Sequence, residues 1–214
     1  IKNLDALLNR IIPKMLEEAN MSEQDLFIGR TDELNQIQNW LEDWNVPQIV
    51  WINGVGGIGK TRLLKETYNR FAARDTDSRL LIPPIFDFDN RTLQVPENLE
   101  FEIARQLGKD AARSYLRLLS DLRKMETGDV SLATIENQKK NLRSEFLASI
   151  NRVAKESRIV LLFDTTDAFD DSQKWGQVID LLEDIVQNIM NIFVAVAGRR
   201  TREHQKSVDS NSVL

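Results

Sequence analysis

The chain has 214 residues, of which 42% are hydrophobic, and its formal net charge is −5 at pH 7, so it fits one large domain with a sizeable core and small additions. It contains no cysteine and one histidine, which excludes disulfides, thiolate metal sites and multi-histidine metal sites. No basic stretch marks a nucleic-acid footprint, no apolar run approaches the roughly 18 residues of a membrane helix, and no signal peptide is visible, so we expect a cytoplasmic protein with no membrane partner.

The hydrophobic pattern predicts helices and strands in alternation. The first half of the chain has a helix over 2–20 that is kinked or broken at Pro13, a helix over about 31–44 with Thr31 as its N-cap, a strand over 48–52 and a helix over about 60–74. A strand over 79–89 follows, which Pro83 and Pro84 make an irregular edge strand. The second half has one or two helices over 97–126 broken near Gly108, a long helix over 131–156, a strand over 158–164, a helix over 174–190 and a strand over 191–197. This order predicts an α/β fold with a mostly parallel sheet covered by helices on both faces. Ligands of such sheets bind at the carboxyl ends of the strands.

A phosphate-binding loop is the strongest functional signal in the sequence. The run Gly54-Val55-Gly56-Gly57-Ile58-Gly59-Lys60-Thr61 fits the pattern G-x-x-x-x-G-K-T and lies between a predicted strand and a predicted helix, as the motif requires. Its glycines let the backbone wrap around phosphates, and the helix N-terminus, which includes Arg62, adds partial positive charge. We expect Lys60 to reach the β- and γ-phosphates and the Thr61 hydroxyl to ligate Mg²⁺. The alternative is a glycine-rich turn that binds no ligand.

Two further groups follow predicted strands and belong at the same edge of the sheet. Asp164 ends an apolar run, where a carboxylate can hold Mg²⁺. Asp167, three residues later, is the candidate for orienting the attacking water, with capping of the following helix as its alternative; Asp170 and Asp171 fit helix capping better. Arg199 follows the strand over 191–197 and can clamp the γ-phosphate, unless it belongs to a surface pair with Arg200.

These motifs together resemble those of the STAND ATPases, the signal-transduction ATPases with numerous domains, which include the NB-ARC and NACHT groups. Phe27-Ile28-Gly29-Arg30 followed by Asp32-Glu33-Leu34 resembles the family's F-x-G-R-x-x-E-L signature. The phosphate loop, the run Asp164-Thr165-Thr166-Asp167 and the run Val196-Ala197-Gly198-Arg199 are similar to its later motifs. The four motifs span roughly residues 27–199. One departure is clear, because Asp167 stands where the family usually has the longer glutamate.

The resemblance implies an ASCE-type P-loop NTPase with a three-layer sandwich, in which the arginine-bearing strand lies between the strands that carry the phosphate loop and Asp164. It implies that Ile28, Gly29 and Arg30 lie beside adenine and ribose, that Asp164 serves Mg²⁺, Asp167 the water and Arg199 the γ-phosphate. The function implied is a switch that binds ATP or ADP, hydrolyses ATP slowly and associates with itself when ATP is bound. The shorter Asp167 adds a reason for slow turnover.

The expected organisation is a helical extension over 1–26, a nucleotide-binding domain over 27–200 and a polar tail over 201–214 that forms a loop or is disordered. Members of the STAND family continue into a helical lid and a winged-helix domain, so this chain, which starts at Ile rather than Met, resembles an excised nucleotide-binding domain.

A GTPase is disfavoured because no N-K-x-D motif is present, and an ABC-type ATPase because no L-S-G-G-Q-like signature is present. A metabolic kinase is disfavoured because the sequence has no obvious arginine-rich lid for binding an acceptor. An interaction module with a degenerate phosphate loop is disfavoured because the loop has every expected residue. A clamp-loader-like AAA+ ATPase acting on DNA or protein stays open.

Overall fold

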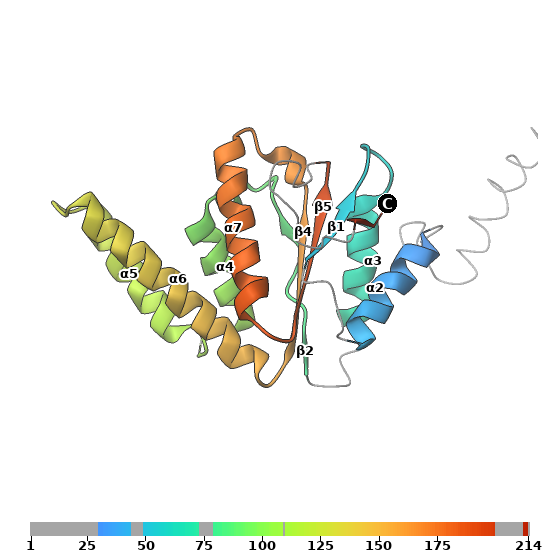
Figure 1. The fold of residues 1–214 in the computed structure, drawn as a ribbon, viewed down its shortest axis with the longest axis horizontal. Coiled ribbons are helices and arrows are strands. Elements are labelled where there is room, and N and C mark those ends of the chain that lie inside the picture. The colour runs from blue at the N-terminus through green and yellow to red at the C-terminus, as the bar shows by residue number, and fades with distance from the viewer. Residues whose placement is uncertain (1–29, 44–48, 73–78, 109, 200–211, 214) are drawn as a thin grey trace, which may run out of the picture.

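A parallel β-sheet with helices on both faces forms the centre of the molecule (Figure 1). The computed structural model describes residues 30–43, 49–72, 79–108, 110–199 and 212–213. Its helices are α2 (Thr31–Asp43), α3 (Lys60–Ala72), α4 (Pro96–Leu107), α5 (Arg113–Glu126), α6 (Leu132–Ala154) and α7 (Ser172–Asn188), with short 3-10 turns η2 (Arg91–Gln94) and η3 (Thr166–Ala168). Its strands are β1 (Ile49–Asn53), β2 (Leu80–Leu81), β3 (Phe86–Asp87), β4 (Arg158–Asp164), β5 (Ile192–Gly198) and β6 (Ser212–Val213). The predicted extension over 1–26 lies outside the described residues.

The order of the strands is β2-β4-β5-β1-β6, with β3 also beside β4, and every pair is parallel. β5 pairs with β1 on one side and with β4 on the other, which confirms the predicted place of the arginine-bearing strand. The carboxyl ends of β1, β4 and β5 therefore meet at one edge of the sheet. Asn53 and Gly198 face each other in register there.

The segment over 79–89 lies at the edge of the sheet beside β4, as predicted, but it is not one continuous strand. The single strand expected over 79–89 is two strands of two residues each, because Pro83 and Pro84 lie between them and proline has no N–H to donate to β4. Of the polar tail over 201–214, expected to be a loop or disordered, the structure describes Ser212 and Val213, which pair with β1 as β6.

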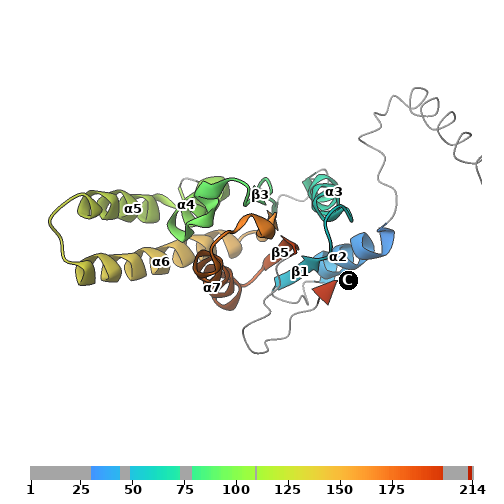
Figure 2. The same cartoon turned by 90° about the horizontal axis from the view of Figure 1, so that it is seen from above.

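Alternating side chains of the strands supply two separate cores. Val160 and Leu162 of β4 pack with α2 and α3, whereas Leu161 and Phe163 pack with α4, α5, α6 and α7. Figures 1 and 2 show these helices on opposite sides of the sheet. Because both faces are covered, every residue of β5 is buried, which agrees with its continuous apolar sequence.

Helix boundaries follow local sequence signals closely. The expected break near Gly108 separates α4 from α5. Asp171 is the N-cap of α7, and its carboxylate accepts a hydrogen bond from the Gln173 N–H at 2.7 Å, as predicted for this residue. Thr31 was expected to be an N-cap but is the first helical residue of α2, since the carbonyl of Arg30 accepts the first helical bond from Leu34.

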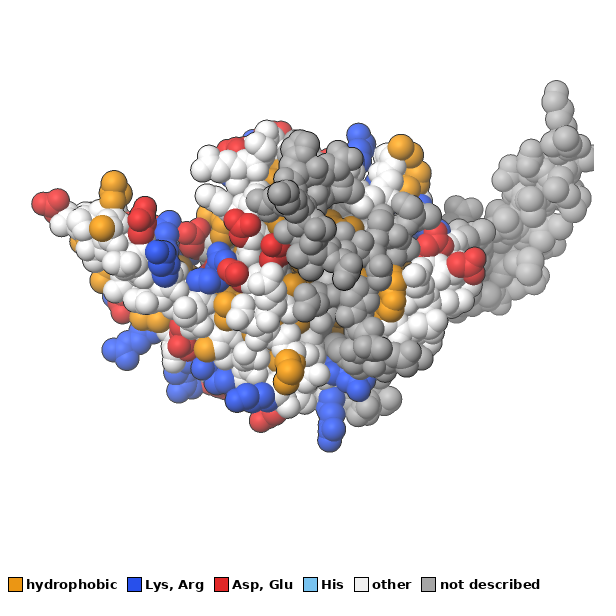
Figure 3. All heavy atoms as spheres, in the orientation of Figure 1, with side chains coloured by type: hydrophobic (Ala, Val, Ile, Leu, Met, Phe, Trp, Pro, Cys, Tyr) orange, Lys and Arg blue, Asp and Glu red, His pale blue; other side chains and the backbone are white. Residues whose placement is uncertain are grey.

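The helices α5 and α6 form a pair that extends beyond the sheet as an arm (Figures 1 and 2). Charged side chains of both signs cover this arm and α7 in the view of Figure 3. Leu132, at the start of α6, is 79% exposed. No helix within the described ranges is long and apolar enough to cross a membrane.

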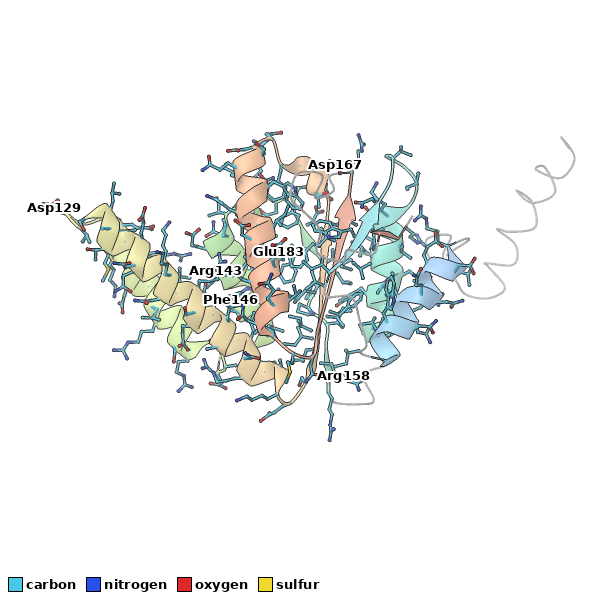
Figure 4. All side chains as sticks on the ribbon, viewed as in Figure 1. Asp129, Arg143, Phe146, Arg158, Asp167 and Glu183 are labelled. Carbon is cyan, nitrogen blue, oxygen red and sulfur yellow. The ribbon has the colours of Figure 1, made fainter. Side chains whose placement is uncertain are left out.

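A charged cluster around the buried Glu100 connects the arm to the rest of the helical layer. Glu100 of α4 is 2% exposed and pairs with Arg143 of α6, whose guanidinium also donates to Asp184 of α7 at 2.9 Å. Figure 4 labels Arg143 on α6, where it faces α7. Burial is the largest influence on Glu100 and raises its pKa to about 7, although Arg143 acts in the opposite direction.

Candidate functional site

The phosphate loop connects β1 to α3 with the backbone that its glycines permit. Gly57 and Gly59 have φ angles of +80° and +89°, a region that residues with a side chain rarely adopt. Lys60 begins α3, and its ammonium group donates to the carbonyls of Gly54 at 2.8 Å and Val55 at 3.1 Å. The charge of the lysine therefore lies across the mouth of its own loop, where a phosphate oxygen would compete with these two carbonyls.

Two oxygen-bearing side chains meet beside the loop. Asp164 is 5% exposed at the end of β4, and the Thr61 hydroxyl at the start of α3 forms a hydrogen bond with its carboxylate. Burial raises the pKa of Asp164, and the hydrogen bonds from Thr61 and from the Thr165 amide oppose that rise. A carboxylate and a hydroxyl are the hard oxygen ligands that Mg²⁺ prefers, so this donor set fits the metal predicted from the sequence.

A second acid lies next to Asp164, and the sequence analysis missed it. Asp87 ends β3 in register with Asp164, and its negative charge contributes to the raised pKa of Asp164. The signal was available, because Phe86-Asp87 is also an apolar residue followed by an acid at the end of a predicted strand. Only the pairing of β3 with β4 brings the two carboxyl groups to neighbouring positions.

The turn after β4 brings Asp167 to Arg199. Thr165 has φ 62° and ψ 48°, which is unusual for a β-branched residue and turns the chain into η3. The Asp167 carboxylate accepts a hydrogen bond from the Arg199 backbone N–H at 2.6 Å and lies 3.1 Å from Arg199 Nε. The alternative that Asp167 caps α7 is wrong, because Asp171 occupies that position. Asp170 pairs instead with Arg91, at 3.2 Å on the exposed surface.

Arg199 also lies against the phosphate loop. A Cβ atom placed on Gly56 would be 2.6 Å from Arg199 Nη2, so the guanidinium occupies the space that the glycine leaves open. At Gly198, one residue earlier, a Cβ atom would be 1.7 Å from the Thr166 hydroxyl oxygen. The end of β5 and η3 are therefore packed too closely for any side chain at Gly198.

One cleft joins these groups. It has a volume of about 440 Å³ and lies at the carboxyl edge of the sheet, the edge that Asp167 marks in Figure 4, whereas Arg158 marks the opposite edge. The lining residues are Gly56, Gly57, Gly59, Lys60, Thr61, Arg62, Lys65, Asp164, Thr165, Asp167, Gly198 and Arg199.

Most of the predicted site residues are therefore brought together. Gly54, Val55 and Ile58 belong to the loop but do not line the cleft, and Val55 is 71% exposed. Arg30 lies close by, since its Nε would be 3.9 Å from a Cβ atom on Gly59. Ile28 and Gly29 lie outside the described residues.

Three lining residues were not predicted. Lys65 follows Thr61 by four residues on α3, so helical spacing could have placed it on the same face. Nothing in the sequence marks Thr165 and Gly198 as site residues except that they adjoin Asp164 and Arg199. Their place in the cleft depends on the turn after β4 and on the register of β4 with β5.

Residues 32–199 match the model of the family described as nephrocystin 3, N-terminal. The chain belongs to the nephrocystin 3 N-terminal family. The matched range contains every residue that lines the cleft, so the cleft lies within the part of the chain that this family shares. Membership of the STAND ATPases is a finer assignment than this match and stays a prediction.

No curated protein matches the chain. Among solved structures, PCH-2 from C. elegans matches with a TM-score of 0.44 and 11% sequence identity. The match covers 86% of this chain and 41% of PCH-2, so the chain spans less than half the length of that protein.

Proposed function

We propose that this domain binds ATP or ADP with Mg²⁺ and hydrolyses ATP slowly, as the nucleotide-gated switch of a signal-transduction ATPase of the P-loop class. The observation that carries the proposal is the way that one cleft at the carboxyl edge of the sheet gathers the predicted groups. Residues from the phosphate loop, the end of β4, the turn after it and the end of β5 all line that cleft. Parallel α/β sheets bind ligands at this edge.

The loop and α3 are proposed to bind the phosphates. The backbone N–H groups and the helix N-terminus would face the negative oxygens, and Lys60 would leave the carbonyls of Gly54 and Val55 for the β- and γ-phosphates. Thr61 and Asp164 would hold Mg²⁺, which neutralises phosphate charge when it is bound. The lack of a guanine-reading N-K-x-D motif favours an adenine nucleotide.

Hydrolysis is assigned to Asp167 and Arg199. Asp167 would orient the attacking water, and Arg199 would contact the γ-phosphate. The side chain of Asp167 is one methylene shorter than the glutamate usual in the family that the sequence resembles, which favours turnover well below the ~10 s⁻¹ typical of enzymes. Self-association in the ATP-bound state is part of the same proposal and rests on that resemblance alone.

A second candidate function is a clamp-loader-like AAA+ ATPase that acts on DNA or protein. The observation in its favour is the strand order, because that class also places the arginine-bearing strand between the other two site strands. ATP hydrolysis measured with and without DNA separates the two functions. Stimulation by DNA supports the second candidate, and a rate that DNA leaves unchanged counts against its DNA-acting form.

Nucleotide binding is tested by calorimetry with Mg²⁺ and ATP, ADP or GTP. Lys60→Ala removes a charge-assisted contact of about 1.5–3 kcal/mol, so affinity for ATP should fall by at least about tenfold. The control is Lys124→Ala on α5, where Lys124 pairs with Asp121 on the exposed arm, and its affinity should equal that of the wild type. Unchanged affinity in Lys60→Ala would refute the site, and a preference for GTP would refute the adenine assignment.

A further inference from the structure

The Asp167–Arg199 pair has a property that the proposed roles of these residues do not include. Both oxygens of the Asp167 carboxylate face the same residue: one accepts from the Arg199 backbone N–H at 2.6 Å, and the other lies 3.1 Å from Nε. The carboxylate proposed to orient water and the guanidinium proposed to contact the γ-phosphate are therefore paired with each other.

The two contacts differ in what they fix. The backbone contact joins η3 to the end of β5 and does not depend on the arginine side chain. Gln94 supports the same turn, because its buried amide donates to the carbonyl of Ala168 at 3.1 Å. Phe169, which follows this turn, is fully buried and packs against Phe88 and Trp175. Asp167 therefore keeps its place if the guanidinium moves away.

The ion pair itself is exposed, and the arginine already lies within reach of the phosphate site. The side chains of Arg199 and Asp167 are 62% and 35% exposed, and exposed ion pairs are weak. Nε of Arg199 faces Asp167, whereas Nη2 lies over Gly56 of the phosphate loop. A phosphate group carries more negative charge than a carboxylate and accepts two parallel hydrogen bonds from a guanidinium, so a γ-phosphate would win this competition.

We infer that the Asp167–Arg199 ion pair is a latch that the γ-phosphate opens. With ADP the pair stays closed and Asp167 is engaged by the guanidinium. With ATP the guanidinium turns to the γ-phosphate, while the backbone N–H of Arg199 keeps Asp167 in position for the water. The inference rests on the proposed function and adds to it the device by which this site distinguishes ATP from ADP.

The latch predicts a selective effect on affinity. A nucleotide with a γ-phosphate must break the ion pair, so the pair reduces its affinity, whereas ADP leaves the pair intact. In Asp167→Asn the amide oxygen still accepts from the backbone N–H, but the charge is lost. Affinity for ATP should then rise by up to about fivefold, the equivalent of about 1 kcal/mol, and affinity for ADP should not change.

The test is a double-mutant cycle read by calorimetry with Mg²⁺, using ADP and the non-hydrolysable β,γ-imido analogue of ATP. The variants are Asp167→Asn, Arg199→Ala and the double variant. We expect Asp167→Asn to raise affinity for the analogue in the wild-type background and to have no effect in the Arg199→Ala background. Asp170→Asn removes the same charge three residues away, where Asp170 pairs with Arg91 outside the cleft, and should change neither affinity.

The outcomes separate the latch from simpler explanations. If Asp167→Asn raises affinity for the analogue equally with and without Arg199, or raises affinity for ADP to the same degree, general charge repulsion explains the effect and the latch is refuted. The latch is also refuted if Asp167→Asn has no effect on a protein that binds both nucleotides. If the wild type binds neither nucleotide, the proposed function fails first and the latch with it. Wild-type affinity of Asp167→Asn for ADP shows that this variant is folded.

Discussion

Replacing Glu100 by glutamine should change how the stability of this protein depends on pH. Glu100 of α4 is 2% exposed, and its pKa is raised from 4.5 to about 7, chiefly by burial. The groups that face it are Arg143 of α6, Tyr115 of α5 and Glu97 on its own helix, while Asp184 of α7 shares the Arg143 guanidinium.

The sign and the size follow from that shift. A carboxyl group whose pKa is raised in the folded state contributes stability that is fully present below pH 4.5 and is lost as pH rises to about 7. Raising the pKa from 4.5 to about 7 corresponds to about 3 kcal/mol, because each tenfold change in proton affinity is worth 1.36 kcal/mol. The free energy of unfolding of the wild type, minus that of Glu100→Gln, should therefore fall by up to about 3 kcal/mol across this range.

Urea unfolding of both proteins at pH values from 4 to 8 measures this difference. The matched control is Glu102→Gln on the same helix, because Arg105 lowers the pKa of Glu102. The wild-type minus Glu102→Gln difference should not fall with pH: it should rise near the acidic end of this range and stay level above it, because a carboxyl group with a lowered pKa contributes stability above pH 4.5 and loses it as pH falls. A wild-type minus Glu100→Gln difference that stays level or increases with pH would show that Arg143, and not burial, decides the charge of Glu100.

Three further outcomes are expected at the site. Asp167→Asn should slow single-turnover hydrolysis of ATP without weakening nucleotide binding, whereas an unchanged rate would remove Asp167 from catalysis. Gly198→Ala should lower the free energy of unfolding by about 1–3 kcal/mol, because the added methyl group overlaps Thr166 and displaces the turn that carries Asp167. The control in thermal unfolding is Gly176→Ala on α7, where a Cβ atom meets nothing within 4 Å. This variant should be as stable as the wild type or more stable. Asp164→Asn should remove most of the gain in ATP affinity that Mg²⁺ provides, and equal gains in variant and wild type in paired titrations with and without Mg²⁺ would exclude Asp164 as a metal ligand.

The sequence predicted the parts of the site that depend on local backbone. The phosphate loop needs Gly57 and Gly59 where φ is positive, and this requirement is legible in the residues themselves. Asp164 ends a continuous apolar run, and Asp171 precedes a helix, so strand end and N-cap followed from pattern alone. The strand order followed from the motifs and the class they resemble, and the pairing of β5 with β1 and β4 confirms it.

Only the tertiary structure decided which groups face each other. Asp87 meets Asp164 through the pairing of β3 with β4, and Glu100 meets Arg143 across 43 positions of sequence. Asp167 was predicted to orient the attacking water and Arg199 to contact the γ-phosphate, but the turn at Thr165 and the close contact of Thr166 with Gly198 bring the two side chains together. Loop, strand-end and cap signals lie within a few neighbouring residues, so they can be recognised in the sequence. These pairings depend instead on the register of the strands and on one strained turn, and the pattern of side chains along the chain specifies neither.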